Sequence, residues 1–287
     1  MKDMNTIIDT HFHIWDTAVF TIPTVKMFEN QLKQKYTLED YQEAIKGVNI
    51  TKSIYTEVDV IKEEHKKEAD MIIALCEDDS NQIIGATIAG DLSSTDFAEY
   101  ILPYAKQSVV KSVRHNLFAG DPKVTESSVF RENVRLLAEL NLMCDLVMPA
   151  EKIMYGVDLV EACPDTRFVI DHCGLCPILS DDMLRKHWRQ GISQYARQPN
   201  TICKVSECGF TNPDYSWKVS DVVDIIRHCI ASFGEERIVY GTNWPVCEIT
   251  GSIHRWMEAL HTVLQDFPDH YHRKLFFDNA LRNYKCE

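Results

Sequence analysis

The sequence predicts an α/β protein whose strands close into a (β/α)8 barrel, also called a TIM barrel. Short β-branched runs alternate with amphipathic stretches along the whole chain, which is typical of parallel strands joined by crossover helices. Eight strand–helix units fit into the 287 residues, and barrels of this length are usually single domains. We therefore expect residues 1–287 to form one domain.

An open, doubly wound sheet is the competing architecture. Such a sheet usually carries a glycine-rich loop directly after its first strand. Here the corresponding position holds His11-Phe12-His13. The first-strand sequence and the eight units together favour the closed barrel.

The predicted strands are short runs rich in apolar and β-branched residues, the composition that strands favour. In chain order they are Thr6–Thr10, Lys52–Val58, Ile83–Gly90, Val109–His115, Leu142–Val147, Arg167–Asp171, Thr201–Ser206 and Arg237–Gly241.

The predicted helices are amphipathic stretches that follow these strands. They are Leu38–Lys46, Glu63–Glu77, Thr95–Lys106, Val129–Leu140, Ala150–Ala162, Asp181–Arg197, Ser220–Phe233 and Ser252–Asp266. Thr37, followed three residues later by Asp40, resembles a capping box at the start of the first helix. We expect a last helix over Tyr271–Tyr284 to cover one end of the barrel.

The composition excludes several classes of function. Apolar residues make up 45% of the chain and charged residues 25%, which are ordinary values for a globular protein. The formal net charge of −13 opposes binding to nucleic acid, because the phosphate backbone repels an acidic protein. The chain has no apolar run near the roughly 18 residues that a membrane span needs. We expect the binding partner to be a small molecule, the substrate. The composition leaves open whether the chain forms a homo-oligomer.

The ten cysteines raise the question of disulfides. Residues 1–5 lead into the first strand without the apolar segment of a secretory leader, so we expect a cytoplasmic protein. Cysteines in such proteins are usually reduced and buried as small hydrophobic residues. Cys173 and Cys176 have the spacing of a redox pair or of half a zinc site. A second such pair, which a structural zinc site would need, is missing from the sequence.

The C-terminal ends of barrel strands form the catalytic face, so a site is expected there. The first predicted strand runs into His11 and His13. Because side chains alternate along a strand, both imidazoles project to the same side, about 6–7 Å apart along the backbone. Two neutral imidazoles placed in this way suit a divalent metal such as zinc. Core or surface histidines with no metal are the alternative interpretation.

Other predicted strands also end in chemically active residues. These residues are Glu57 at the end of the second strand, Arg114 and His115 at the fourth, Asp171 and His172 at the sixth, Lys204 and Glu207 at the seventh, and Asn243 after the eighth. A third histidine at a strand end is what a barrel metal site needs. Alternatively, Asp171 simply forms a hydrogen bond with His172.

Six segments carry a resemblance to a known family. They are Asp9–Trp15, Val113–His115, Pro164–Gly174, Cys203–Ser206, Tyr240–Cys247 and Asp278–Ala280. In this order they resemble the amidohydrolase-related family that contains 2-pyrone-4,6-dicarboxylate lactonase and L-fuconolactonase, within the amidohydrolase superfamily. The resemblance implies a metal-dependent hydrolase on a (β/α)8 barrel.

The resemblance also implies roles for single residues. His11, His13 and His172 match the histidines that hold a divalent metal, with zinc the expected ion, or that polarise a carbonyl, and Asn243 occupies the position of a further ligand. Arg114 matches an arginine that grips a substrate carboxylate or hydroxyl. Further substrate contacts are expected from His115 and Lys204 at strand ends, and from Trp15 and Trp244, because aromatic faces pack well against sugar rings.

The chain departs from the family pattern at Asn243. The resemblance places an aspartate there, which accepts a proton from the attacking water. An asparagine side chain has no usable basicity near neutral pH. It also brings no negative charge to a metal held by three neutral imidazoles, so we expect a weakly bound metal or none, although three histidines alone can bind zinc.

A hydrolase without this aspartate needs another base. Glu57 is the first candidate, and a salt bridge with Arg114 or Lys204 is the structural alternative for this residue. Glu207, His115 and Asp171 follow as candidates. A metal-bound water that ionises without a dedicated base is the remaining alternative.

We expect a hydrolase that opens a sugar-acid lactone or a similar cyclic ester by attack of water on a polarised carbonyl. Two alternatives stay open. One is a non-hydrolytic relative, such as a decarboxylase or a lactone isomerase on the same barrel. The other, suggested by Asn243, is a catalytically impaired homologue that binds a ligand without turnover.

Overall fold

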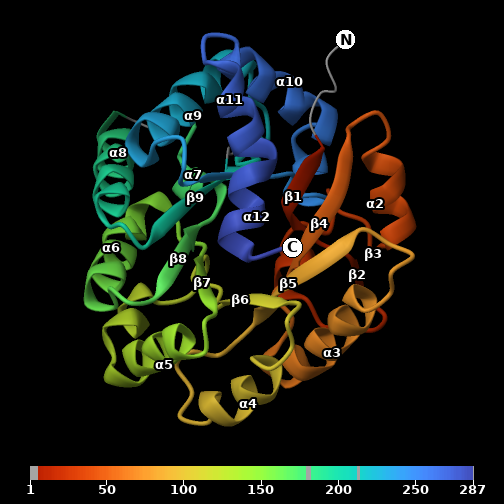
Figure 1. The fold of residues 1–287 in the computed structure, drawn as a ribbon, viewed down its shortest axis with the longest axis vertical. Coiled ribbons are helices and arrows are strands. Elements are labelled where there is room, and N and C mark those ends of the chain that lie inside the picture. The colour runs from red at the N-terminus through yellow and green to blue at the C-terminus, as the bar shows by residue number, and fades with distance from the viewer. Residues whose placement is uncertain (1–5, 179–181, 212–213, 287) are drawn as a thin grey trace.

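The computed structural model describes residues 6–178, 182–211 and 214–286. Within them, eight parallel strands form a ring surrounded by helices (Figure 1). In ring order the strands are β1 (Ile7–Phe12), β4 (Ile50–Thr56), β5 (Ile83–Ala89), β6 (Val110–Arg114), β7 (Met143–Leu146), β8 (Arg167–Ile170), β9 (Thr201–Ser206) and β10 (Ile238–Gly241).

The ring closes where β10 meets β1. The His13 N–H donates to the Trp244 carbonyl at 2.8 Å, and the Asn243 N–H donates to the His11 carbonyl at 2.8 Å. These bonds follow the C-terminal end of β10 and hold two of the predicted site segments against each other. The predicted (β/α)8 barrel is confirmed.

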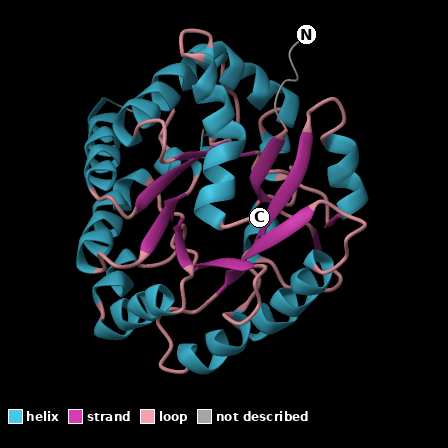
Figure 2. Cartoon of the chain, viewed as in Figure 1, coloured by secondary structure: helices cyan, strands magenta, loops and turns pink. Residues whose placement is uncertain are grey.

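The predicted helices lie on the outside of the ring (Figure 2). They are α2 (Leu38–Ala44), α3 (His65–Cys76), α4 (Phe97–Tyr104), α5 (Ser128–Glu139), α6 (Ile153–Ala162), α8 (Asp182–Arg197), α9 (Val219–Phe233) and α10 (Ile253–Leu264). Asp181, the predicted first residue of one helix, lies outside the described residues. The Thr37 side chain accepts from the Asp40 N–H, and the Asp40 side chain accepts from the Thr37 N–H, so the predicted capping box is confirmed.

The C-terminal segment covers the N-terminal end of the barrel, where α12 lies over the strand ring (Figure 1). It comprises α11 (Asp269–Arg273), a π-helical turn η6 (Lys274–Asp278) and α12 (Asn279–Tyr284). The single helix predicted over Tyr271–Tyr284 is therefore interrupted. Tyr284 packs against the barrel interior on Met143, Val169 and their neighbours. With this end covered, access to the interior is left to the loops at the C-terminal ends of the strands.

The loop after β1 holds elements that the sequence analysis missed. A two-stranded ribbon pairs β2 (Trp15–Asp16) with β3 (Lys35–Tyr36), and the short helix α1 (Pro23–Met27) lies between them. These pieces are too short for their periodicity to be read from a sequence. A similarly short turn, α7 (His172–Leu175), follows β8.

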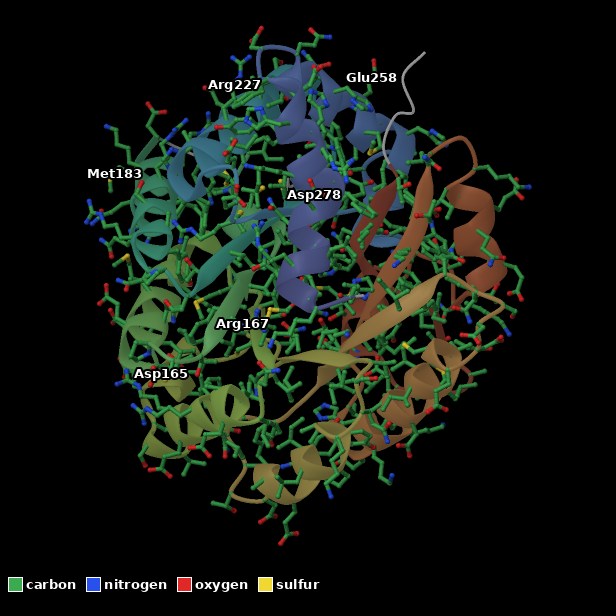
Figure 3. All side chains as sticks on the ribbon, in the orientation of Figure 1. Asp165, Arg167, Met183, Arg227, Glu258 and Asp278 are labelled. Carbon is green, nitrogen blue, oxygen red and sulfur yellow. The ribbon has the colours of Figure 1, made fainter. Side chains whose placement is uncertain are left out.

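Charged side chains such as Arg227 and Glu258 lie on the outer faces of the helices (Figure 3). None of the described helices is both long and apolar enough to cross a membrane. None of the ten cysteines, all of which lie within the described residues, takes part in a disulfide, and nine of them are buried, as expected of reduced core residues.

Candidate active site

Three histidines meet at the C-terminal end of the barrel. His11 lies at the end of β1 and His13 directly after it, and His172 follows β8. The Nε2 atoms of His11 and His13 are 3.2 Å apart. The ring centres of His11 and His172 are 4.4 Å apart. Because all three side chains are buried, they form one compact cluster.

Each imidazole is oriented through its Nδ1 atom. The His13 Nδ1 lies 2.7 Å from the Thr56 carbonyl, which can only accept, so Nδ1 carries the proton and Nε2 keeps its lone pair. The His172 Nδ1 lies 2.8 Å from the Ser206 hydroxyl. The His11 Nδ1 lies 3.3 Å from the Lys204 ammonium and 3.6 Å from a carboxylate oxygen of Asp171.

Burial keeps these histidines neutral. Desolvation, with a contribution from the Arg114 charge, lowers the pKa of His13 to about 3. Desolvation also lowers the pKa of His172 to about 3, against the opposing influence of Asp171. The pKa of His11 is lowered well below its usual value, first by desolvation and then by Lys204. Neutral imidazoles are the form that binds a metal ion.

The donor set fits a divalent metal such as zinc. Two nitrogens bound at about 2.0–2.1 Å to one tetrahedral ion lie about 3.3 Å apart, close to the 3.2 Å between the Nε2 atoms of His11 and His13. Ligand atoms of His11, Asp171 and His172 also lie within 4.8 Å of one another. Because the Lys204 ammonium can only donate to the His11 Nδ1, binding of a metal at the His11 Nε2 would require the other tautomer, whose Nδ1 proton would point toward Asp171, 3.6 Å away.

A buried charged cluster lies beneath the histidines. Lys204 contacts Asp145 at 2.8 Å and Asp171 at 2.9 Å. Arg114 contacts Asp171 at 3.4 Å and forms a closer ion pair with Glu57. Two positive and three negative side chains give this cluster a formal charge of −1. This charge would partly offset a divalent ion, which the neutral Asn243 does not.

Asn243 takes a left-handed backbone conformation, with φ of 58°, which asparagine tolerates better than most residues. Its side-chain Nδ2 donates to the Glu207 carbonyl at 3.2 Å. The residue lines the same cavity as His13 and His172. The structure therefore brings the predicted metal cluster and Asn243 to one place.

Glu57 does not face this cavity. One carboxylate oxygen accepts from Arg114 Nε, and the other accepts from the Asp59 N–H at 2.6 Å. Arg114 also donates through Nη2 to the Glu57 carbonyl at 2.7 Å. These contacts support the salt bridge with Arg114, the structural alternative for Glu57, and its role as the general base stays a prediction.

The other predicted bases are also engaged away from the cavity. Glu207 accepts from the Thr250 hydroxyl at 2.9 Å and from the Gly209 N–H, and burial raises its pKa to about 7. The His115 Nδ1 accepts from the Leu92 N–H at 3.1 Å. Asp171 is paired with Lys204 and Arg114.

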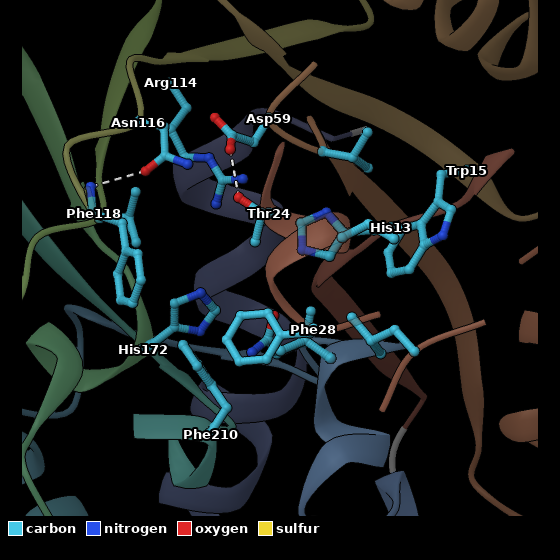
Figure 4. Close-up of a pocket in the computed structure, with 16 residues that line it drawn as sticks. His13, Trp15, Thr24, Phe28, Asp59, Arg114, Asn116, Phe118, His172 and Phe210 are labelled. Atoms are coloured by element: carbon cyan, nitrogen blue, oxygen red, sulfur yellow. Dashed lines mark hydrogen bonds between the residues drawn. The ribbon is translucent and has the colours of Figure 1, made fainter. Parts of the chain in front are cut away.

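The cavity above the histidines has an empty volume of about 650 Å³, part of it open to solvent. Figure 4 shows His13, His172, Arg114 and Asp59 around it, with Phe28, Phe118 and Phe210. The described residues that line it are His13, Trp15, Thr24, Val25, Phe28, Leu32, Val58, Asp59, Arg114, Asn116, Phe118, Val147, His172, Phe210, Asn243 and Val246.

Three predicted substrate contacts do not line this cavity. Trp244 is buried, donates to Glu248 at 2.8 Å and packs against Tyr36 and Tyr41. His115 lines a neighbouring hollow. Lys204 lies below the histidines, fully buried. Of the predicted substrate residues, Trp15 and Arg114 are the two at the cavity wall.

Asp59, which was not among the predicted site residues, provides the one carboxylate among the described residues that line the cavity. It lies three residues beyond β4, with φ of 63°, and accepts a hydrogen bond from the Thr24 hydroxyl. The only indication of Asp59 in the sequence was its position, since it is an acidic residue directly after a predicted strand.

The structure also places Cys173, one of the two cysteines with the spacing of a redox pair, in a group of three thiols. The Cys173 thiol lies with those of Cys203 and Cys229, all three within 4.8 Å of one another and buried. Cys176 is also buried.

Comparison with known proteins identifies relatives of similar sequence and fold. The chain is 23% identical to an L-fucono-1,5-lactonase of Burkholderia multivorans over 88% of both chains. A crystal structure of an amidohydrolase from Burkholderia multivorans with bound zinc superposes with a TM-score of 0.89, at 18% identity, covering 99% of this chain and 100% of the other.

A second structure, of a probable 2-pyrone-4,6-dicarboxylic acid hydrolase from Acinetobacter baumannii with citric acid bound, gives a TM-score of 0.77 at 16% identity, covering 98% and 100% of the two chains. At these identities both structures support the fold alone. The family model described as Amidohydrolase matches residues 8–286. The resemblance inferred from the six segments is confirmed, and the chain belongs to this amidohydrolase family.

Proposed function

We propose that this protein hydrolyses a lactone or a similar cyclic ester by attack of water on a polarised carbonyl. The observation that carries the proposal is the cluster of His11, His13 and His172, which is buried, neutral and adjacent to a cavity that also exposes Arg114. Its family membership and its lactonase relative support the same reaction class. On this proposal its partner is a small molecule of the cytoplasm.

The same three histidines would hold a divalent metal, with zinc the ion that best suits an imidazole donor set. When bound there, such an ion supplies a Lewis acid that polarises the scissile carbonyl. Thr56 and Ser206 fix the orientation of His13 and His172 through their Nδ1 atoms, as the supporting groups of metal-binding histidines usually do. The His11 Nδ1 lies beside Lys204 and Asp171.

Arg114 orients the substrate on this proposal. Glu57 and Asp171 hold three of its five N–H groups, and the two others have no partner among the described residues. Because the residue lines the cavity, these groups can donate to an oxygen of the substrate. Asn243 can accept a hydrogen bond from the attacking water but cannot take its proton. On this proposal the proton passes to the ring oxygen, which leaves as a hydroxyl when the ring C–O bond breaks.

The proposal is tested by metal analysis of the purified protein together with a panel of lactones. Release of acid is followed with a pH indicator, before and after dialysis against a chelator. We expect turnover of at least one lactone and about one equivalent of divalent metal per chain in zinc-supplemented protein. Binding of lactones without turnover would instead favour the catalytically impaired homologue.

Replacing Asn243 by aspartate should strengthen metal binding. The substitution adds a negative charge beside three neutral imidazoles, and we expect a fall in the zinc Kd of about tenfold or more. Competition with a fluorescent chelator measures this Kd. The control is Asn116→Asp, which adds the same charge to the wall of the same cavity away from the histidines. Equal effects of the two substitutions would contradict a direct role of residue 243 at the metal.

Replacing Glu57 by glutamine should affect stability more than catalysis. The substitution weakens a buried charge-assisted hydrogen bond to Arg114, which typically stabilises a protein by about 1.5–3 kcal/mol. Removal of a true general base would lower kcat by about 10²–10⁴, whereas we expect a change of less than about tenfold. Urea unfolding and steady-state kinetics measure the two effects, and the exposed Glu63→Gln is the control. A loss of kcat beyond a hundredfold with normal stability would restore Glu57 as the base.

A further inference from the structure

The side of the cavity next to Arg114 is negative. Arg114 brings one positive charge there, but Glu57 and Asp171 already oppose it with two negative charges. Asp59 adds a third carboxylate at the cavity wall. Its neighbour Thr24 is neutral and donates a hydrogen bond to it. With Lys204 and Asp145 counted, these six side chains carry a formal charge of −2, which a divalent ion on the histidines would bring to zero. A substrate that carries several carboxylates would therefore find no net positive charge here. Asp59 would repel a carboxylate placed beside it, because charges near a cavity of low polarity are poorly screened.

The remaining wall is mostly apolar. Trp15, Val25, Phe28, Phe118, Val147 and Phe210 all line it, and Figure 4 shows the phenyl rings of Phe28, Phe118 and Phe210 around the opening. The rings of Phe118 and Phe210 are 6.4 Å apart, and Phe210 lies 5.7 Å edge-on from His172. An apolar group attached to the reacting ring would therefore be buried beside the histidines.

Several polar side chains of the wall are already committed to protein partners. The Asn116 carbonyl oxygen accepts from the Phe118 N–H at 2.9 Å. The Asn243 Nδ2 donates to the Glu207 carbonyl at 3.2 Å, and the Thr24 hydroxyl donates to Asp59. A ring with three or more hydroxyls would lose hydrogen bonds to water here without regaining them, and each unpaired polar group costs about 1–3 kcal/mol.

We infer that the natural substrate is an uncharged lactone with an apolar substituent or fused ring and at most one hydroxyl. That hydroxyl donates to Asp59, and the two unpartnered N–H groups of Arg114 bind an oxygen of the ester. Dicarboxylate pyrones and polyhydroxylated sugar lactones are poor substrates. This inference rests on the proposed lactone hydrolysis and narrows it to one class of lactone.

The first test compares four compounds on the zinc-supplemented protein. δ-Decalactone and dihydrocoumarin represent uncharged apolar lactones, L-fucono-1,5-lactone a sugar lactone, and 2-pyrone-4,6-dicarboxylate a dianion. We expect kcat/KM for the better apolar lactone to exceed the values for L-fucono-1,5-lactone and 2-pyrone-4,6-dicarboxylate by at least about a hundredfold. This is the range that a hydrophobic pocket can discriminate. A sugar lactone or dicarboxylate turned over as well as the apolar lactones would overturn the inference.

A pair of variants tests the role of the apolar wall. Phe118→Asn places a polar group on the wall, and because Phe118 is only half-buried the fold should tolerate it. We expect kcat/KM for the apolar lactones to fall about tenfold or more, with little loss for L-fucono-1,5-lactone. Phe267→Asn is the matched control, since Phe267 is also half-buried but packs against Tyr271 away from the cavity. Equal losses for both compounds in Phe118→Asn would contradict a role in selectivity.

A second variant tests the charge argument. Asp59→Asn removes one negative charge from the cavity wall and retains the size of the side chain. We expect the Kd of 2-pyrone-4,6-dicarboxylate to fall by about tenfold, whereas an unchanged Kd would show that Asp59 does not repel anions.

Binding of unreactive lactams separates the two proposals if no lactone is hydrolysed. A δ-lactam with an alkyl chain and D-gluconolactam resist hydrolysis, and isothermal titration calorimetry measures their affinities directly. If the alkyl lactam binds more tightly and no lactone is turned over, the proposed selectivity for apolar ligands stands and the proposed hydrolysis is rejected. Tighter binding of the polyhydroxylated lactam would reject the selectivity whatever the turnover.

Discussion

The Lys204→Met variant is expected to unfold with a free energy about 3–5 kcal/mol lower than that of the parent protein. Lys204 is fully buried and contacts the carboxylates of Asp145 and Asp171. Removing the ammonium leaves these two groups buried without their main counter-charge, and breaking a buried pair in this way is strongly destabilising. Urea-induced unfolding followed by circular dichroism measures the change.

Lys66→Met is the matched control for this variant. Lys66 also forms an ion pair, with Asp70 at 2.8 Å, but both side chains are largely exposed. Solvent-exposed pairs contribute little to stability, so we expect almost no change. A small loss in Lys204→Met, comparable to the control, would mean that the buried carboxylates are neutralised or rearranged without cost.

The His13→Ala variant is expected to lose about 10²–10³ in kcat/KM toward the best lactone substrate, the usual effect of removing one group that stabilises charge at a reacting carbonyl. His13 lines the cavity, and its Nε2 is 3.2 Å from that of His11. The variant should also retain less zinc after dialysis, because the ion would lose one of three imidazoles.

His228→Asn is the control for the loss of a histidine. His228 lies on α9 near the Arg189 carbonyl, at 3.2 Å, and is remote from the cavity in sequence and in contacts. We expect its kcat/KM and zinc content to match the parent protein. If His13→Ala keeps full activity while its zinc content falls, then hydrolysis does not depend on the histidine cluster as a metal site.

The order of elements and the position of the site could be predicted from the sequence. Eight short apolar runs separated by amphipathic stretches are a local pattern, and each run became a barrel strand. His11, His13, His172 and Asn243 follow strands in the sequence. Because parallel strands of a barrel end on the same face, local placement was sufficient to bring them together.

The partner that each charged residue takes could not be predicted in this way. Glu57 follows β4 as His13 follows β1, yet Arg114 from β6, two strands further along the ring, binds its carboxylate. Lys204 was expected at the substrate but lies between Asp145 and Asp171 below the histidines. Which charged side chains form ion pairs depends on the distances between them across the barrel. These distances cannot be read from a single sequence.

The cavity wall was decided by the tertiary structure alone. Phe28, Asp59, Phe118 and Phe210 come from four separate loops, and each has neighbours in the sequence that face elsewhere. Loop conformation follows from packing between segments far apart in the chain rather than from a local repeat. The sequence by itself therefore determined the barrel, the family and the histidine cluster, because these depend on periodicity and on strand ends. The tertiary structure decided which side chains surround the substrate, because that depends on long-range packing.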